Sequence, residues 1–401
     1  MNKAIEDWIS VKMSSLMREY FISLLKSSIL KTQPKEVPEG IDFAEIFNCA
    51  KSQQVASLMY YAVEKLDNGP DAQLKVKWEK MFYEAIRNDA TQQHEFEKLV
   101  KTLTENDVKL MPLKGSVMKK IYPKTDMRTM CDIDILYSCG DYEKVKGLME
   151  SEGYKVLKWD KIYHDSFYKL PVTNVELHRH LVEATNKNRR YFDLAWERAV
   201  RDRENPNLYY MTDEDFYIFM VQHAASHFNE SGLGVRPFVD MFVYLDSKRQ
   251  LDFDYIKKEL SILKLTKFEA QIKKVAGVWF GDEPYDLEVK KIEEFVFSNG
   301  IYGNGASAGT ARIASVAKGN GGLLVKTLFI LKSAFPGRSH MQECFRFLKK
   351  APFLIPVFWV VRWFNILFFK RFKFSTVLNP AMKASGDEVK RYAEIMKIFG
   401  L

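Results

Sequence analysis

Two aspartates separated by one residue, Asp132 and Asp134, lie in a run of apolar residues that favours a β-strand. Side chains alternate between the two faces of a strand, so both carboxylates should share one face while Ile133 and Ile135 point into the core. Magnesium prefers oxygen ligands and is usually held by one or two carboxylates together with water and substrate phosphates. The pair therefore predicts a Mg²⁺ site whose remaining ligands come from a bound phosphate group.

A third acid, Glu176, stands between Val175 and Leu177 in a later strand-like run. If that strand lies beside the first one, three carboxylates converge on one site. Asp165 and Glu183 are the alternatives if the strand register differs. Three such acids suit two-metal phosphoryl transfer, with Glu176 holding the metal on the acceptor side or acting as the base.

Lys114, Gly115 and Ser116 stand where a strand is expected to end and a helix to begin. Glycine allows a phosphate to approach the backbone, and the free amides of a helix N-terminus favour negative charge. The lysine ammonium and the serine hydroxyl would add contacts. This turn is therefore predicted to bind phosphate.

The elements expected to position these residues form a small α+β domain with a mixed sheet at 106–182. Period-two runs predict strands, and runs with helical spacing predict helices. The strands are expected at 108–113, 131–137, 154–159, 162–170 and 174–181, and the helices at 115–122 and 141–153. All-helical regions are expected on both sides, at 1–105 and 183–299. Candidate helices in the second region are 191–201, 212–229, 235–248, 253–263, 266–279 and 286–298. Residues 300–401 should form a glycine-rich linker at 300–322 and a basic, apolar helical segment.

Several short motifs together resemble a known family. They are LKG at 113–115, IYP at 121–123, Arg128, DIDIL at 132–136, ELH at 176–178, the pair His223 and His227, and Asp240. This pattern resembles the polymerase-β-type nucleotidyltransferase superfamily and, more narrowly, a bacterial family of uncharacterised nucleotidyltransferases. The resemblance covers residues 105–245 well and the flanks loosely.

The resemblance implies a Mg²⁺-dependent enzyme whose site has room for one or two ions. It would move a nucleotidyl group from a nucleoside triphosphate such as ATP to an unknown acceptor hydroxyl or phosphate, releasing pyrophosphate. Asp132, Asp134 and Glu176 would hold the metal. The triphosphate would be bound by Lys114, Gly115, Ser116 and Arg128. Four further residues would either contact the acceptor or support the residues that do: His178, His223, His227 and Asp240.

The histidines also have ordinary structural interpretations. His223 and His227 are four residues apart and hence on one helix face, but the sequence between them lacks the glutamate of a metalloprotease motif and no third zinc ligand is evident. They are expected either to pack in the core or to lie beside the cleft. His178 shares a face with Glu176 and would orient that acid or belong to an ordinary strand surface.

The net charge of +8 is a local property. Residues 318–374 contain eleven basic side chains and one acid, a charge of +10, so the rest of the chain carries −2. General nucleic-acid binding does not follow from this distribution, although RNA or protein remains an alternative acceptor. Four separated cysteines and an N-terminal stretch unlike a signal peptide favour a cytoplasmic protein.

An apolar stretch at 351–369 is flanked by lysines and arginines. Two interpretations have similar weight: peripheral membrane contact through 351–374, or a terminal helix buried in the fold. Peripheral membrane contact would fit a protein that is not an enzyme. That alternative is a non-catalytic binding or regulatory protein that keeps the fold and attaches to a membrane surface.

Overall fold

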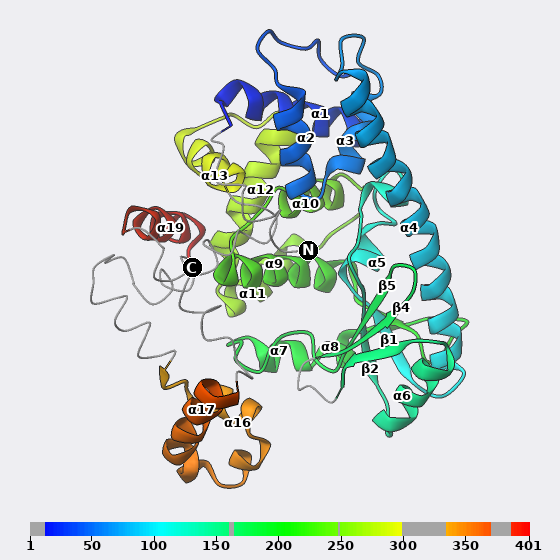
Figure 1. Cartoon of the computed structure of the whole chain (residues 1–401), viewed down its shortest axis with the longest axis vertical. Helices are drawn as coiled ribbons and strands as arrows, with labels where there is room; N and C mark the ends of the chain where they lie inside the picture. Colours follow the sequence, from blue (N-terminus) through cyan, green and yellow to red (C-terminus); the bar gives the residue numbers. More distant parts are fainter. Residues whose placement is uncertain (1–12, 160–163, 248, 299–333, 370–385) are drawn as a thin grey trace.

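The computed structural model describes residues 13–159, 164–247, 249–298, 334–369 and 386–401 (Figure 1). Its centre is a five-stranded mixed sheet with the strand order β1-β2-β5-β4-β3. Only the β2–β5 pair is parallel. The strands are β1 (Lys109–Pro112), β2 (Ile133–Ser138), β3 (Lys155–Lys158), β4 (His164–Lys169) and β5 (Thr173–His178). The predicted α+β class with a mixed sheet is therefore confirmed.

Helices precede, interrupt and follow this sheet. Those before it are α1 (Ser15–Leu30), α2 (Phe43–Ser52), α3 (Ala56–Val63) and α4 (Ala72–Thr104). Those between its strands are α5 (Lys114–Met118), the 3-10 helix η1 (Thr125–Met127) and α6 (Tyr142–Ser151). Those after it include α7 (Arg189–Asp193), α8 (Ala195–Arg198), α9 (Asp213–Glu230), α10 (Arg236–Asp246), α11 (Phe253–Leu263), α12 (Thr266–Phe280) and α13 (Leu287–Phe297). The C-terminal elements are α16 (Arg338–Cys344), η2 (Arg346–Lys349), η3 (Pro352–Leu354), α17 (Ile355–Phe369) and α19 (Gly386–Phe399).

Alternation along the strands divides the side chains of the sheet between two environments. Ile133, Ile135, Val175 and Leu177 are buried in one core, together with side chains of α4 and α6. The opposite face carries the acids, as the two-residue period predicted. Helices α4 and α6 therefore cover the face of the sheet that carries Ile133 and Ile135, which was predicted to be apolar.

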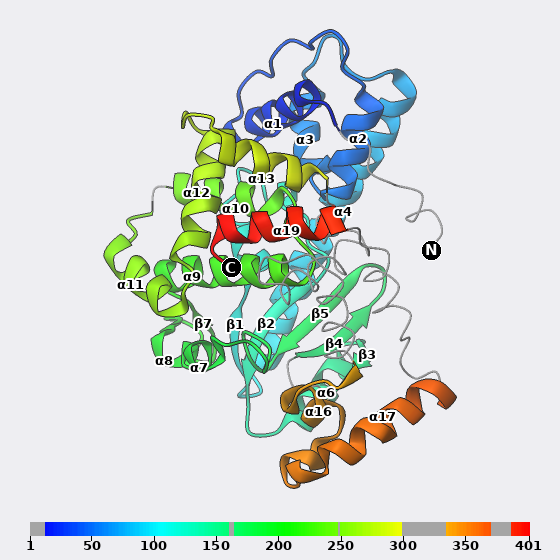
Figure 2. The same ribbon diagram turned by 90° about the vertical axis from the view of Figure 1, so that its left-hand side faces the viewer.

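A second, larger core joins the helices that precede the sheet in the sequence to the helices that follow it. It contains side chains from α1–α3, from α9–α13 and from α19. A buried ion pair between Arg18 and Glu293, 2.9 Å apart, links the first helix directly to α13. Figures 1 and 2 show these helices side by side above the sheet. The N-terminal helices and the 183–299 helices therefore form one helical body.

Helix α4 belongs to both cores. Trp78 near its start is buried in the helical body, whereas Leu99 and Leu103 near its end are buried against the sheet. The helix contains 33 residues with neither glycine nor proline, and Asp71 caps its start by accepting from the Leu74 amide. At about 1.5 Å per residue it is about 50 Å long.

Several predicted boundaries were wrong. The strand expected at 131–137 begins at Ile133, and the helix expected at 115–122 covers only Lys114–Met118. The run at 191–201 is broken into α7 and α8, and it ends in a small hairpin of β6 (Val200–Arg201) and β7 (Tyr209–Tyr210) that was not predicted. The expected linker at 300–322 lies outside the described residues.

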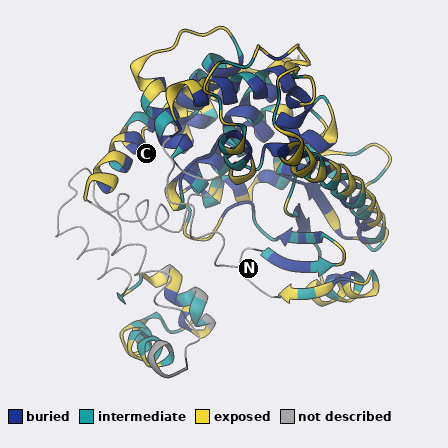
Figure 3. Cartoon of the chain, turned by 45° about the horizontal axis from the view of Figure 1, so that its top comes forward, coloured by how far each residue is buried: buried dark blue, intermediate teal, exposed yellow. Residues whose placement is uncertain are grey.

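The apolar stretch at 351–369 forms η3 and α17, and its described side chains, at 351–365, are not buried in the helical body. Each of residues 351–365 is partly or fully exposed, so the interpretation as a buried terminal helix is wrong. Figure 3 shows α16 and α17 set apart from the dark-blue interior of the molecule. Within the described part of the chain, no helix combines the length and the apolar character needed to cross a bilayer.

Candidate functional site

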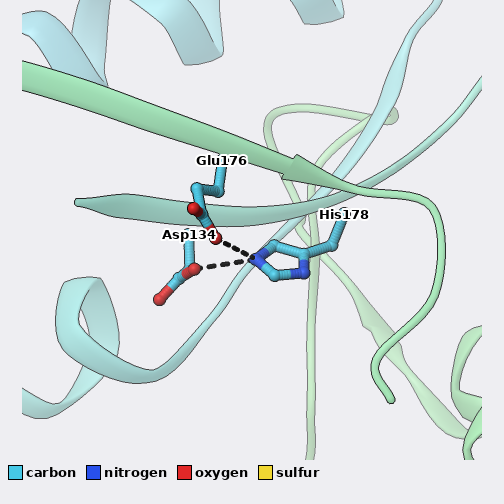
Figure 4. Close-up of side chains that lie close together, drawn as sticks. All are labelled: Asp134, Glu176 and His178. Carbon is cyan, nitrogen blue, oxygen red and sulfur yellow. Dashed lines mark hydrogen bonds and ion pairs between the residues drawn. The ribbon is translucent and has the colours of Figure 1, made fainter. Parts of the chain in front are cut away.

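The parallel pairing of β2 with β5 places two of the predicted acids opposite each other. Asp134 pairs with Glu176 in the strand register, and Leu136 pairs with His178. Because Glu176 and His178 are two residues apart, they lie on the same face as Asp134. Figure 4 shows the three side chains converging from the two strands.

His178 lies between the two acids. Its Nε2 is 2.7 Å from Asp134 Oδ1 and 3.7 Å from Glu176 Oε2. One ligand atom from each of the three residues lies within 4.8 Å of the others, a spacing that could hold a metal ion. Sequence reasoning expected His178 to orient Glu176, but its shorter contact is with Asp134. We therefore interpret His178 as a residue that positions Asp134.

The third predicted acid, Asp132, lies in the bend just before β2 and is partly exposed. Burial and, after it, the negative charges of Asp134 and Glu176 together raise the pKa of its carboxyl to about 6. Burial alone would also raise the pKa of Asp134, but the Lys114 ammonium and the hydrogen bond from His178 lower that pKa below its usual range. Three carboxylates that repel one another fit a divalent cation, because its charge would relieve that repulsion.

The predicted phosphate turn is only partly as expected. Lys114 Nζ lies 3.8 Å from Asp134 Oδ2, and Lys114 has a positive φ of 29°, which is uncommon for a residue with a side chain. Ser116 is buried, and it is absent from the described residues that line the cavity. Helix α5 has five residues, so its dipole offers little charge to a phosphate. At this turn, the positive charge that could bind a phosphate therefore comes from the Lys114 side chain and not from the helix N-terminus.

Gly115 leaves room at the same turn. A Cβ at this position would lie 2.4 Å from Met130 Sδ and 3.4 Å from Arg128 Nη1. A side chain here would displace Met130 and crowd the Arg128 guanidinium. The glycine thus lets Arg128 approach the turn that also carries Lys114.

Arg128 is held in place by Asp240, 112 residues later in the chain. Its Nε and Nη2 each donate to one carboxylate oxygen of Asp240 at 2.8 Å, a bidentate arrangement. Tyr122 donates its hydroxyl to Asp240 Oδ1 at 2.6 Å. The sequence placed Asp240 either at the acceptor or behind the residues that contact the substrate, and its contacts fit the second of these, because it orients Arg128.

A cavity of about 780 Å³ lies between the acidic face of the sheet and helices α9 and α10. Lys114, Gly115, Arg128, Asp132, Asp134, Glu176 and His178 line it on one side, and His223, His227, Arg236 and Asp240 line it on the other. Its volume is within the range of roughly 300–1,000 Å³ that is usual for small-molecule sites. The structure therefore brings every predicted site residue except Ser116 to one cavity.

His223 and His227 are in direct contact, with their Nε2 atoms 2.8 Å apart. Burial, followed by the nearby Lys114 charge, lowers the pKa of His227 to about 4 and that of His223 well below its usual range. The two rings are therefore neutral near pH 7, and one donates to the other.

This burial predicts a pH dependence of stability. The unfolded imidazoles bind protons below about pH 6.5, whereas folded His227 stays neutral down to about pH 4. The free energy of unfolding should thus fall as the pH drops through this range, by up to about 1.4 kcal/mol per pH unit for each ring. Urea unfolding measured at a series of pH values should show a shallower fall for His227→Gln. An unchanged slope in that variant would contradict the assignment.

Two residues near the acids or the cavity were missed from the sequence. His164 on β4 pairs with His178 in the register, and its Nε2 lies 3.6 Å from Glu176 Oε1. Arg236 donates to Gln54 Oε1 at 2.8 Å and also to the Thr129 carbonyl, which ties the segment after Arg128 to the helical body. The two-residue alternation of β4 could have indicated His164, but no local signal indicates Arg236.

Comparison with known proteins gives one match. A model of a family described as uncharacterised nucleotidyltransferase matches residues 39–281. No curated protein and no solved structure matches the chain. The match includes the whole sheet, the acidic face, and helices α9 and α10 opposite it. With more than half of its length matched, this chain belongs to the uncharacterised nucleotidyltransferase family.

Proposed function

We propose that this protein transfers a nucleotidyl group from a nucleoside triphosphate to an acceptor hydroxyl or phosphate and releases pyrophosphate. One observation carries the proposal: a single cavity wall combines Asp132, Asp134 and Glu176 with the cations Lys114 and Arg128. Family membership supports the same reaction class. Acids that hold a cation, beside basic residues that bind phosphate oxygens, are what phosphoryl transfer requires.

The three acids have the oxygen donors that Mg²⁺ prefers, and their mutual repulsion supports a cation among them. When bound there, magnesium would neutralise charge on the phosphate oxygens and on the departing pyrophosphate. Lys114 and Arg128 bind the triphosphate, Asp240 orients Arg128, and His178 holds the Asp134 carboxylate in place. The helix wall that carries His223 and His227 faces the acceptor.

The cavity volume supports a small-molecule acceptor over the alternative acceptors, RNA and protein. A test of activity also distinguishes this proposal from the alternative of a non-catalytic protein with the nucleotidyltransferase fold. Such a protein could bind nucleotide, but it would not release pyrophosphate.

The test is to incubate the purified protein with each nucleoside triphosphate, Mg²⁺ and panels of sugars, sugar phosphates, RNA and protein. Pyrophosphate release and transfer of label from the α-phosphate are measured. We expect release with at least one nucleotide and its loss in the absence of Mg²⁺. Activity that survives in the double variant Asp132→Ala, Asp134→Ala would contradict the proposal.

A further inference from the structure

An exposed row of large apolar side chains runs from η3 along α17. Phe353, Val357, Val360 and Phe364 are 78%, 55%, 69% and 53% exposed, respectively. Val357, Val360 and Phe364 share one face of α17 because they are three or four residues apart, and Phe353 in η3 precedes them by four residues. These four side chains are here called the exposed stripe. Contiguous apolar patches on a folded protein usually mark an interaction surface.

The other side of α17 packs against its own segment. Phe358 contacts Phe345 and Phe347, with ring centroids 4.9 Å and 4.7 Å apart. Trp359 Nε1 donates to the Pro336 carbonyl at 3.0 Å. These contacts fix the rotation of the helix, so the exposed stripe is held facing outward.

Basic residues accompany the exposed stripe. Lys349 and Lys350 are exposed immediately before it, and Arg338 is exposed on α16. Residues 334–369 carry a net charge of +4, so a second copy of the chain would bring two basic segments together, which opposes self-association through this surface. An anionic lipid surface matches both features, because it accepts apolar side chains beside the headgroups and attracts lysine.

We propose that residues 334–369 dock on an anionic membrane surface, with the exposed stripe inserted among the lipids and Lys349 and Lys350 against the headgroups. Residues 334–369 carry a net charge of +4 and the rest of the chain another +4, so the chain as a whole adds no net repulsion from an anionic surface. This surface is separate from the cavity residues, so the proposal is independent of nucleotidyl transfer.

The test is co-sedimentation of the full chain with vesicles of phosphatidylcholine, alone or mixed with phosphatidylglycerol. We expect binding to the mixed vesicles that weakens as salt increases. Phe353→Ser together with Val360→Ser should reduce binding by about ten-fold or more, because two apolar side chains no longer enter the lipid. Lys349→Gln with Lys350→Gln keeps the exposed stripe and should remove the preference for anionic vesicles.

A matched control is Val76→Ser with Leu287→Ser, which changes side chains that are 64% and 67% exposed on α4 and α13. The control should bind as the unmodified chain does. Three results would overturn the proposal. The first is that the unmodified chain does not bind anionic vesicles, and the second is that the control variant loses vesicle binding to the same extent as the stripe variant. The third is a dimer, seen in light scattering, that the substitutions in the exposed stripe abolish.

Discussion

Asp134→Asn is expected to lower the rate of pyrophosphate release by on the order of 10³-fold, as expected when a group that stabilises transition-state charge is lost. Asp134 is the acid closest to both a cation and a positioning residue, with Lys114 at 3.8 Å and His178 at 2.7 Å. Asparagine keeps the shape of the side chain and can still accept from His178, but it lacks the charge that would hold a metal. Steady-state pyrophosphate release at saturating nucleotide measures the effect.

The matched control is Asp193→Asn, which removes an exposed carboxylate paired with His180 and Arg189. Asp193 is not among the described residues lining the cavity, so this change should leave activity near that of the unmodified protein. Thermal unfolding of both variants checks that the fold is kept. Asp134→Asn activity within about ten-fold of the unmodified chain would remove Asp134 from the metal-binding role, since losing such a group costs about 10²–10³-fold.

Arg128→Lys is the second change with a large expected effect. Lysine carries the same charge but cannot make the two parallel hydrogen bonds that Arg128 makes to Asp240. The cation would no longer be fixed beside Gly115, so the KM for nucleotide should rise by about 10–100-fold. Initial rates at varied nucleotide concentration separate this rise from a change in kcat.

A double-mutant cycle with Asp240→Asn separates positioning from simple stability. Arg128→Lys alone leaves the largely buried Asp240 carboxylate poorly paired, and it should lower the free energy of unfolding by up to about 3 kcal/mol. Asparagine at 240 removes that unpaired charge, so the double variant should regain stability while its KM stays high. If KM recovers together with stability, Arg128 has only a structural role.

Local periodicity was sufficient to predict the acidic face. Asp134 and Glu176 lie in short strands between buried aliphatic residues, and a period of two assigns such residues to the opposite face. The α+β class followed from the same patterns. Asp132 was predicted to lie on the same strand as Asp134, but it stands in the bend one residue before that strand.

Contacts between distant residues could not be predicted in this way. Periodicity reports which face a residue occupies, but not which element packs over that face. The pairing of Arg128 with Asp240 and the position of the histidine helix over the acids depend on the docking of the helical body. The shortness of α5 and the burial of Ser116 likewise follow from packing against neighbouring elements rather than from local preference.

The continuous helix α4 limits how the protein can admit a substrate. A hinge that closed the sheet onto α9 and α10 would have to bend a helix anchored in both cores, through Trp78 at one end and Leu99 at the other. No glycine or proline in α4 can absorb such a bend. We therefore expect the gap between the two walls to be set when the chain folds, so that ligands are selected by their fit to a preformed space rather than by domain closure.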